Sequence, residues 1–387
     1  ASSGTRKPGW RETIPEDWLK GVTHSEFWEQ TALYSEMAIT AARADRNRLI
    51  ELIGHMENMS PPAQEQLLSL LSSEATTMLP EADRLGIWNE LVALVIRHRK
   101  YPDARWAMQN EQIDRITTIA NRLAPQTPQL RHQRLFSENV FQLLEEKGDF
   151  DEQVRELQRR RRQAIEDIAV NGGAESILDL AAAVESPWQG GIAAAAVAGL
   201  EIDELVLPDL LDSNQEHLAQ FAAGYTRNRY FVHGWTWVDA IDTTRWPLSH
   251  VGQFLSFLPF SPGTWERATR LLGPNEIAYW GNTSANAFEA EADLTVAIER
   301  LITYERPIAA LRCFYVMLLD KQPIDVGYAV RALLAAVRSE EGAHSMDVYQ
   351  TVEIIKALQA NPSISPDDLF RVEWAYLPLL DGQRDAV

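Results

Sequence analysis

Cysteine is almost absent from this chain. Cys313 is the single cysteine among 387 residues, and it lies in the apolar run 311–315. One thiol forms neither an internal disulfide nor a cysteine-based zinc site. We therefore expect Cys313 to be a buried core thiol. The scarcity of cysteine also fits a reducing compartment, which predicts a cytoplasmic location.

Long apolar runs are missing as well. A helix needs about 20 consecutive apolar residues to cross a bilayer. The longest candidate, 192–200, is alanine-rich and interrupted by Gly199, and no signal-peptide core opens the chain. We expect no membrane span. Residue 1 is alanine rather than methionine, so we also expect the chain to be part of a longer protein or complex.

The common catalytic and nucleotide-binding signatures do not occur. The sequence contains no GxxxxGK[ST], GxGxxG, GxSxG or HExxH pattern. The histidines are scattered, and none stands three or four residues from another, the spacing that places two metal ligands on one helix face. We expect no catalytic residue, cofactor or metal. The alternative is an enzyme of unfamiliar type, in which His233 or His250 converges with carboxylates in a helical cleft.

Positive charge is in short supply. Lys and Arg number 36 against 55 Asp and Glu, which gives a net charge of −19. Such a field repels phosphate backbones. The exception is a basic strip of Arg155, Arg159 and Arg162, which share one helical face. The strip contacts RNA or DNA, or it is a solvated face paired with glutamates such as Glu156. We favour the second interpretation and do not expect nucleic acid to be the partner.

Helical periodicity fills most of the chain. Apolar residues recur at 3.6-residue spacing, for example over 85–96 and 294–302. Ser261 and Ser365 each precede a proline and are expected N-caps at helix starts. Short breaks between helices place neighbours antiparallel. We predict an all-α protein, and within that class an irregular α-solenoid of stacked antiparallel helical hairpins, similar to TPR or HEAT arrays.

A change of composition predicts the internal organisation. The polar stretch 145–162 gives way to an Ala- and Leu-rich stretch over 174–211, with Asn171-Gly172-Gly173 between them. Consecutive glycines break helices. We predict a flexible tail over 1–14, the N-terminal half of the helical array over 15–172 and the C-terminal half over 173–387.

The segment Tyr225–Trp246 has the most unusual composition. Aromatic residues alternate with arginines over about six helical turns. Both kinds of residue are enriched at interface hot spots, and arginine stacks on aromatic rings. The alternative is a thick inter-helix core, since Phe231 and Trp235 lie at i and i+4. The predicted partner-binding residues are Tyr225, Arg227, Arg229, Tyr230, Trp235, Trp237 and Trp246.

A resemblance rests on three strings, which are Pro259–Trp265, Ala278–Trp280 and Leu369–Leu380. In these the chain resembles the long helical C-terminal regions of very large bacterial proteins, some of them similar to STAND-type or sirtuin-linked defence proteins. The resemblance implies a sensor array whose effector or NTPase domain lies outside these residues, and it carries over no catalytic residue. We therefore expect a protein-binding module, a sensor or scaffold of a larger bacterial protein, with a protein or peptide partner and a role in antiphage defence.

Overall fold

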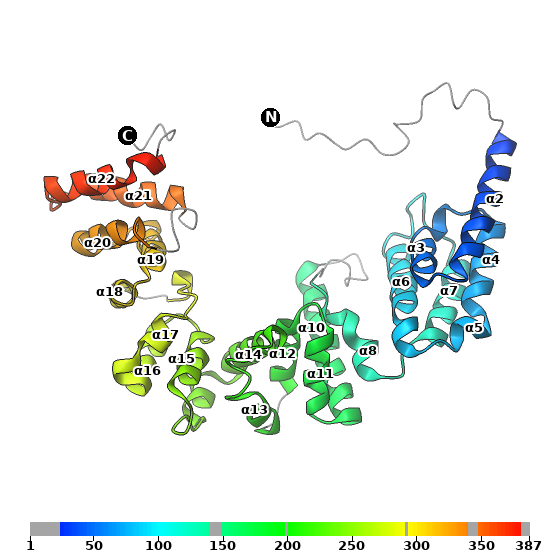
Figure 1. Ribbon diagram of the computed structural model, residues 1–387, viewed down its shortest axis with the longest axis horizontal. Coiled ribbons are helices and arrows are strands. Elements are labelled where there is room, and N and C mark those ends of the chain that lie inside the picture. Colours follow the sequence, from blue (N-terminus) through cyan, green and yellow to red (C-terminus); the bar gives the residue numbers. More distant parts are fainter. Residues whose placement is uncertain (1–23, 139–148, 198–199, 291–292, 340–346, 381–387) are drawn as a thin grey trace. The chain divides into compact units, whose positions relative to one another are not determined.

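The computed structural model describes residues 24–138, 149–197, 200–290, 293–339 and 347–380 (Figure 1). Every regular element within these ranges is a helix, and the ranges contain no strand, which confirms the all-α prediction. None of the described helices is long and apolar enough to cross a membrane. The predicted tail over 1–14 lies outside the described residues.

The chain separates into two compact units. The first comprises Ala1–Asp167 with Ala183–Glu185, and the second comprises Ile168–Ala182 with Ser186–Val387. The division falls inside helix α10 (Phe150–Gly172), whereas the composition of the sequence places a boundary at the end of that helix, at 171–173.

The first unit is a helical bundle around one apolar core. Its elements before α10 are α2 (His24–Ala42), α3 (Arg46–Gly54), η2 (Met56–Asn58), α4 (Pro61–Ser72), α5 (Glu74–Thr77), α6 (Glu81–Lys100), α7 (Asn110–Leu123), α8 (Pro128–His132) and η3 (Gln133–Phe136). Helix α6 packs against α3 and α7, and α4 packs against α2 and α7.

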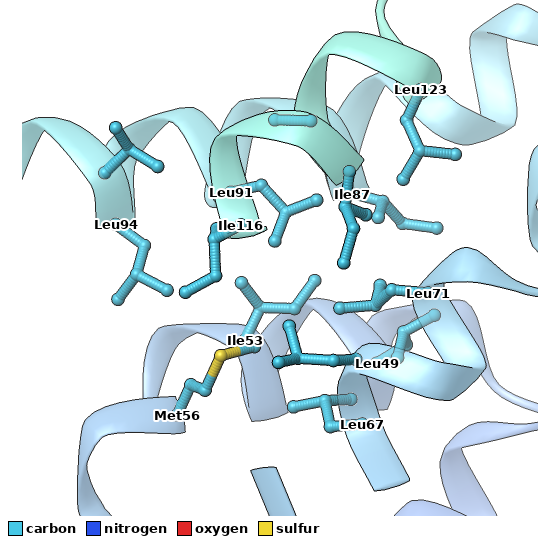
Figure 2. Close-up of a cluster of buried hydrophobic side chains, with 14 of the residues drawn as sticks. Leu49, Ile53, Met56, Leu67, Leu71, Ile87, Leu91, Leu94, Ile116 and Leu123 are labelled. Atoms are coloured by element: carbon cyan, nitrogen blue, oxygen red, sulfur yellow. The ribbon is translucent and has the colours of Figure 1, made fainter. Parts of the chain in front are cut away.

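Side chains from α3, η2, α4, α6 and α7 meet in this core (Figure 2). Each is at most 5% exposed; they are Leu49, Ile53, Met56, Leu67, Leu71, Ile87, Leu91, Leu94, Ile116 and Leu123. The buried amide of Gln64 donates to the Met56 and Met59 carbonyl oxygens and accepts from Gln112, so α4, η2 and α7 are also tied by hydrogen bonds. Burial of these apolar side chains is the main force that holds the bundle together.

The second unit follows with α11 (Glu175–Ala183), which the division crosses. The elements after it are α12 (Pro187–Val197), α13 (Leu200–Val206), α14 (Glu216–Ala240), α15 (Leu248–Ser256), α16 (Pro262–Leu272), η4 (Gly273–Asn275), α17 (Ile277–Trp280), η5 (Ala287–Glu289), α18 (Thr295–Thr303), α19 (Pro307–Leu319), α20 (Val326–Ala336), α21 (Val348–Gln359) and α22 (Pro366–Leu380).

Prolines begin helices in this unit as the sequence predicts. α16 starts at Pro262 and α22 at Pro366. The cap prediction holds for Ser365, whose hydroxyl accepts the Asp368 backbone N–H at 3.1 Å. Ser261 is likewise the N-cap residue of α16, but its side chain makes no cap hydrogen bond. There the Ser261 carbonyl already accepts the backbone N–H groups of Thr264 and Trp265, which closes the first turn without a side-chain cap.

Helices α12 and α14 approach each other at backbone distance. A Cβ atom placed on Gly191 would lie 2.1 Å from the Phe221 carbonyl oxygen, and one placed on Gly224 would lie 2.2 Å from the Trp188 carbonyl oxygen. No side chain fits at either position. Buried alanines of α12, such as Ala194, continue the close face. This pair of glycines therefore sets how deeply α14 is seated in the unit.

Two adjacent glycines test this close approach. Gly191→Ala puts a methyl group against backbone that cannot yield, and overpacking of this kind costs about 1–3 kcal/mol or more. Gly190→Ala meets only the Phe221 ring at 3.5 Å, an ordinary contact, and alanine is about 1 kcal/mol better than glycine inside a helix. We expect urea unfolding to show G191A destabilised and G190A unchanged or stabilised. Equal stability of the two variants would contradict the described packing.

Candidate functional site

Helix α14 carries most of the predicted partner-binding segment and is kinked near its end. Gly234 has φ 63° and ψ −156°, a backbone conformation that side-chain-bearing residues rarely adopt. The kink re-aims the last turns, which carry Trp235 and Trp237. Residues two positions apart on a helix lie about 200° apart around its axis, so the segment has an inner and an outer side.

The inner side converges on one carboxylate. Asp203 of α13 accepts hydrogen bonds from the Tyr225 hydroxyl at 2.7 Å, from Arg229 Nε and Nη2 at 3.0 and 2.7 Å, and from Trp237 Nε1 at 3.2 Å. Burial, with the hydrogen bond to Asp203, raises the pKa of Tyr225, so its hydroxyl stays a donor. The Arg229 guanidinium also lies 5.6 Å from the Trp237 ring centroid. We call these four residues the Asp203 cluster.

Three of the predicted partner-binding residues are therefore internal. Tyr225, Arg229 and Trp237 are buried in the unit, where they hold α13 against both arms of α14. Trp246 is half-buried, and its ring meets the Phe254 ring of α15 edge-on at 5.6 Å. These side chains have partners within the fold, which leaves the outer side of the segment as the surface available to another molecule.

Arg227 and Phe231 form the outer side. Phe231 is 63% exposed, and the Arg227 guanidinium lies 5.1 Å from its ring centroid. Arg227 Nη2 donates to Glu289 Oε1 at 2.6 Å. Burial alone would raise the pKa of Glu289, but hydrogen bonds from Arg227 and from the Phe260 backbone N–H hold it below its usual value. Glu289 is thus ionised, and Arg227 is fixed beside an exposed ring.

Trp235 joins α14 to α16, and Tyr230 packs against Trp235 within α14. The Arg267 guanidinium stacks over the Trp235 ring at 3.9 Å, and Tyr230 meets the same ring edge-on at 4.8 Å. Arg267 is itself held by Asp239 and by the Gly263 carbonyl. A Cβ on Gly263 would lie 2.7 Å from Trp235 Cζ2, so glycine is needed for this contact. Trp235 is half-buried and mainly secures the end of α14.

Three aromatic residues that sequence reasoning missed lie on η5, α19 and α21, and η5 is tied to α14 by the Arg227–Glu289 ion pair. Phe288 of η5 is 70% exposed. The next residue, Glu289, forms the ion pair with Arg227 of α14. Phe288 and Tyr315 of α19 line one groove, and the Tyr315 ring centroid lies 6.2 Å from that of Tyr349 on α21, which is 64% exposed. We call Phe231, Phe288, Tyr315 and Tyr349 the aromatic strip. Phe288 and Tyr349 are each the only aromatic residue of their element, and Tyr315 follows the core residue Phe314, so no local pattern in the sequence indicates these three.

The basic strip lies on α10. Arg155, Arg159 and Arg162 are exposed, and Arg159 donates to both oxygens of Glu156 at 2.7 and 2.6 Å. Hydrogen bonds from Arg159 and Arg160 lower the pKa of Glu156 to about 2. This pairing offsets part of the positive charge that a nucleic acid would require. Binding of nucleic acid through this strip remains a prediction that a salt titration with RNA or DNA would measure.

Arg161, in the middle of the arginine run, serves the fold. It is buried, its Nε donates to the Leu135 carbonyl at 2.7 Å, and burial lowers its pKa to about 10.

The groups on which an enzyme would depend are dispersed. His233 is exposed and lies 2.7 Å from Arg229, and no hydrogen bond or ion pair joins His233 or His250 to a carboxylate in the described part of the chain. Within the same residues no three His, Cys, Asp or Glu side chains form a metal-binding group. Cys313 is free and fully buried, which confirms the core-thiol prediction, and burial raises its pKa to about 12.

The chain matches no protein-family model, no curated protein and no solved structure. The function of the chain is therefore inferred from the residues on its own surface.

The Asp203 cluster predicts a graded effect of mutation on stability. Asp203→Ala leaves the buried Arg229 without its counter-charge, which costs about 3–5 kcal/mol. Tyr225→Phe removes one hydrogen bond and leaves the ion pair in place, at a cost of about 1 kcal/mol. Urea unfolding followed by tryptophan fluorescence should separate the two variants. If D203A costs no more than Y225F, the cluster does not hold α13 against α14.

Proposed function

We propose that this chain is a protein-binding helical array that captures a peptide segment of a partner protein on the aromatic strip. The observation that carries the proposal is an exposed Phe231 ring beside Arg227, whose guanidinium is fixed by Glu289. Exposed apolar surface rimmed by polar groups is typical of interaction sites, and aromatic and arginine residues dominate their energetics. A side chain that is already fixed loses little entropy on binding.

The pairing of helices supports an array architecture for this proposal. Helix α19 packs against α18, α20 and α21, and α22 packs against α20 and α21 (Figure 1). Each helix thus contacts its nearest neighbours in the sequence, as in repeat proteins, where each repeat contacts only the adjoining ones. This supports, as part of the proposal, an irregular α-solenoid of stacked hairpins. Such arrays present extended surfaces, and two residues of the aromatic strip, Tyr315 and Tyr349, lie on two of these helices, α19 and α21.

The wider role is part of the same proposal. The resemblance of Pro259–Trp265, Ala278–Trp280 and Leu369–Leu380 to helical sensor regions supports a sensor or scaffold function within a larger bacterial protein, in the cytoplasm and in defence. In that role the chain needs no catalytic group of its own, only a surface that recognises a partner.

Two exposed phenylalanines of the same unit test the site. Peptides would be selected from a random phage-displayed library on the full chain, and their affinities measured by titration. Phe231→Ala should weaken binding by about thirtyfold, the effect of losing an interface hot spot. Phe370→Ala is the matched control, because Phe370 of α22 is 60% exposed but lies outside the aromatic strip. Its affinity should not change.

Both variants should keep the helical circular-dichroism spectrum, since neither ring is buried. Loss of binding in F370A but not in F231A would move the site to α22. Failure to enrich any peptide would overturn the proposed function.

A further inference from the structure

The residues that line the groove beside Phe288 indicate the chemistry of the partner. It measures about 220 Å³ and lies among η5 with the residues before it, α19 and α21. Phe288 and Tyr315 supply aromatic surface, and Gln350 supplies an amide. An amide side chain both donates and accepts, so it can pair with the backbone of an extended peptide.

Arg312 is the only charged side chain that lines this groove. It is exposed, and no hydrogen bond or ion pair joins it to another residue in the part of the chain that the structure describes. By contrast, Arg227 forms an ion pair with Glu289, and Arg267 forms one with Asp239. Among the described residues that line it, the groove has one cation and no acid, in a chain of net charge −19. The charge that complements it is a single carboxylate.

We infer that this groove binds an acidic peptide segment, in which an apolar side chain rests on Phe288 and Tyr315 and a neighbouring Asp or Glu carboxylate pairs with Arg312. The inference rests on the proposed function and names the partner chemistry of the same surface. Arginine suits a carboxylate because its fork of N–H donors bonds both oxygens at once. A nucleic acid fits less well, because the groove offers one cation and the remaining charge of the chain repels a polyanion.

Defined peptide pools test this inference directly. Three pools of fluorescein-labelled nonapeptides share a central Leu or Phe anchor and differ in the flanking residues, which are Asp or Glu, their isosteres Asn or Gln, or Lys. Fluorescence anisotropy with the full chain should show the acidic pool binding about tenfold more tightly than the amide pool, equivalent to about 1.4 kcal/mol. The advantage should shrink in 1 M salt, where the screening length is about 3 Å.

Charge variants assign the preference to Arg312. R312Q should abolish the advantage of the acidic pool, and R312E should favour the Lys pool. R245E is the matched control, because Arg245 is also exposed, belongs to the same unit and does not line the groove, so the net charge changes equally. The acidic preference should survive in R245E.

Each remaining outcome decides something. Equal binding of the acidic and amide pools, or equal effects of R312E and R245E, would overturn the inference and leave the proposed function standing. Binding of no pool would overturn both. A single-stranded oligonucleotide that binds more tightly than the acidic pool, in a manner dependent on Arg312, would assign the groove to nucleic acid and contradict the inference.

Discussion

Asp203 accepts four hydrogen bonds from α14, two of them from Arg229. The donors Tyr225 and Trp237 stand on opposite sides of the kink at Gly234, so one carboxylate fixes both arms of the helix. A buried ion pair of this kind resists rotation, because turning α14 would leave charge unpaired in a medium of low dielectric constant. With 225 and 229 held inward, helical geometry turns 227 and 231 outward.

The close approach of α12 and α14 also helps to fix the position of α14. Because Gly191 and Gly224 have no side chain, the two backbones approach more closely than any other residue would allow. The two glycines thus set how closely α14 approaches α12, and Asp203 sets the rotation of α14 about its own axis. These internal contacts determine where Arg227 and Phe231 lie on the outer side of α14. The hydrogen bond from Arg227 to Glu289 then joins that side to η5.

These contacts show which features of the protein can be predicted from sequence. Helix type and helix starts follow from local patterns, as at Pro262 and Pro366, and the burial of Cys313 follows from its apolar surroundings. The two sides of the aromatic segment follow from i, i+4 spacing, which pairs Tyr225 with Arg229 and Arg227 with Phe231. Treating the segment as one surface, as its composition suggests, merges residues that face opposite ways.

Local sequence patterns do not predict contacts between residues that are far apart in the chain. Nothing near Asp203 distinguishes it from other acidic residues of its stretch, since its partners come from a later helix. The aromatic strip joins rings of four separate elements, and only Phe231 lies in a segment whose composition stands out in the sequence. Only the packing of those elements brings Phe288, Tyr315 and Tyr349 together.

Hydrogen exchange with and without a selected peptide tests the central claim, that the aromatic strip is the recognition surface, most directly. Exchange should slow on binding at 284–288 and at the start of α21 near 348–350, the backbone that borders the groove, while the first unit stays unchanged. Protection confined to α22 or to the first unit, with none at 284–288, would contradict the account.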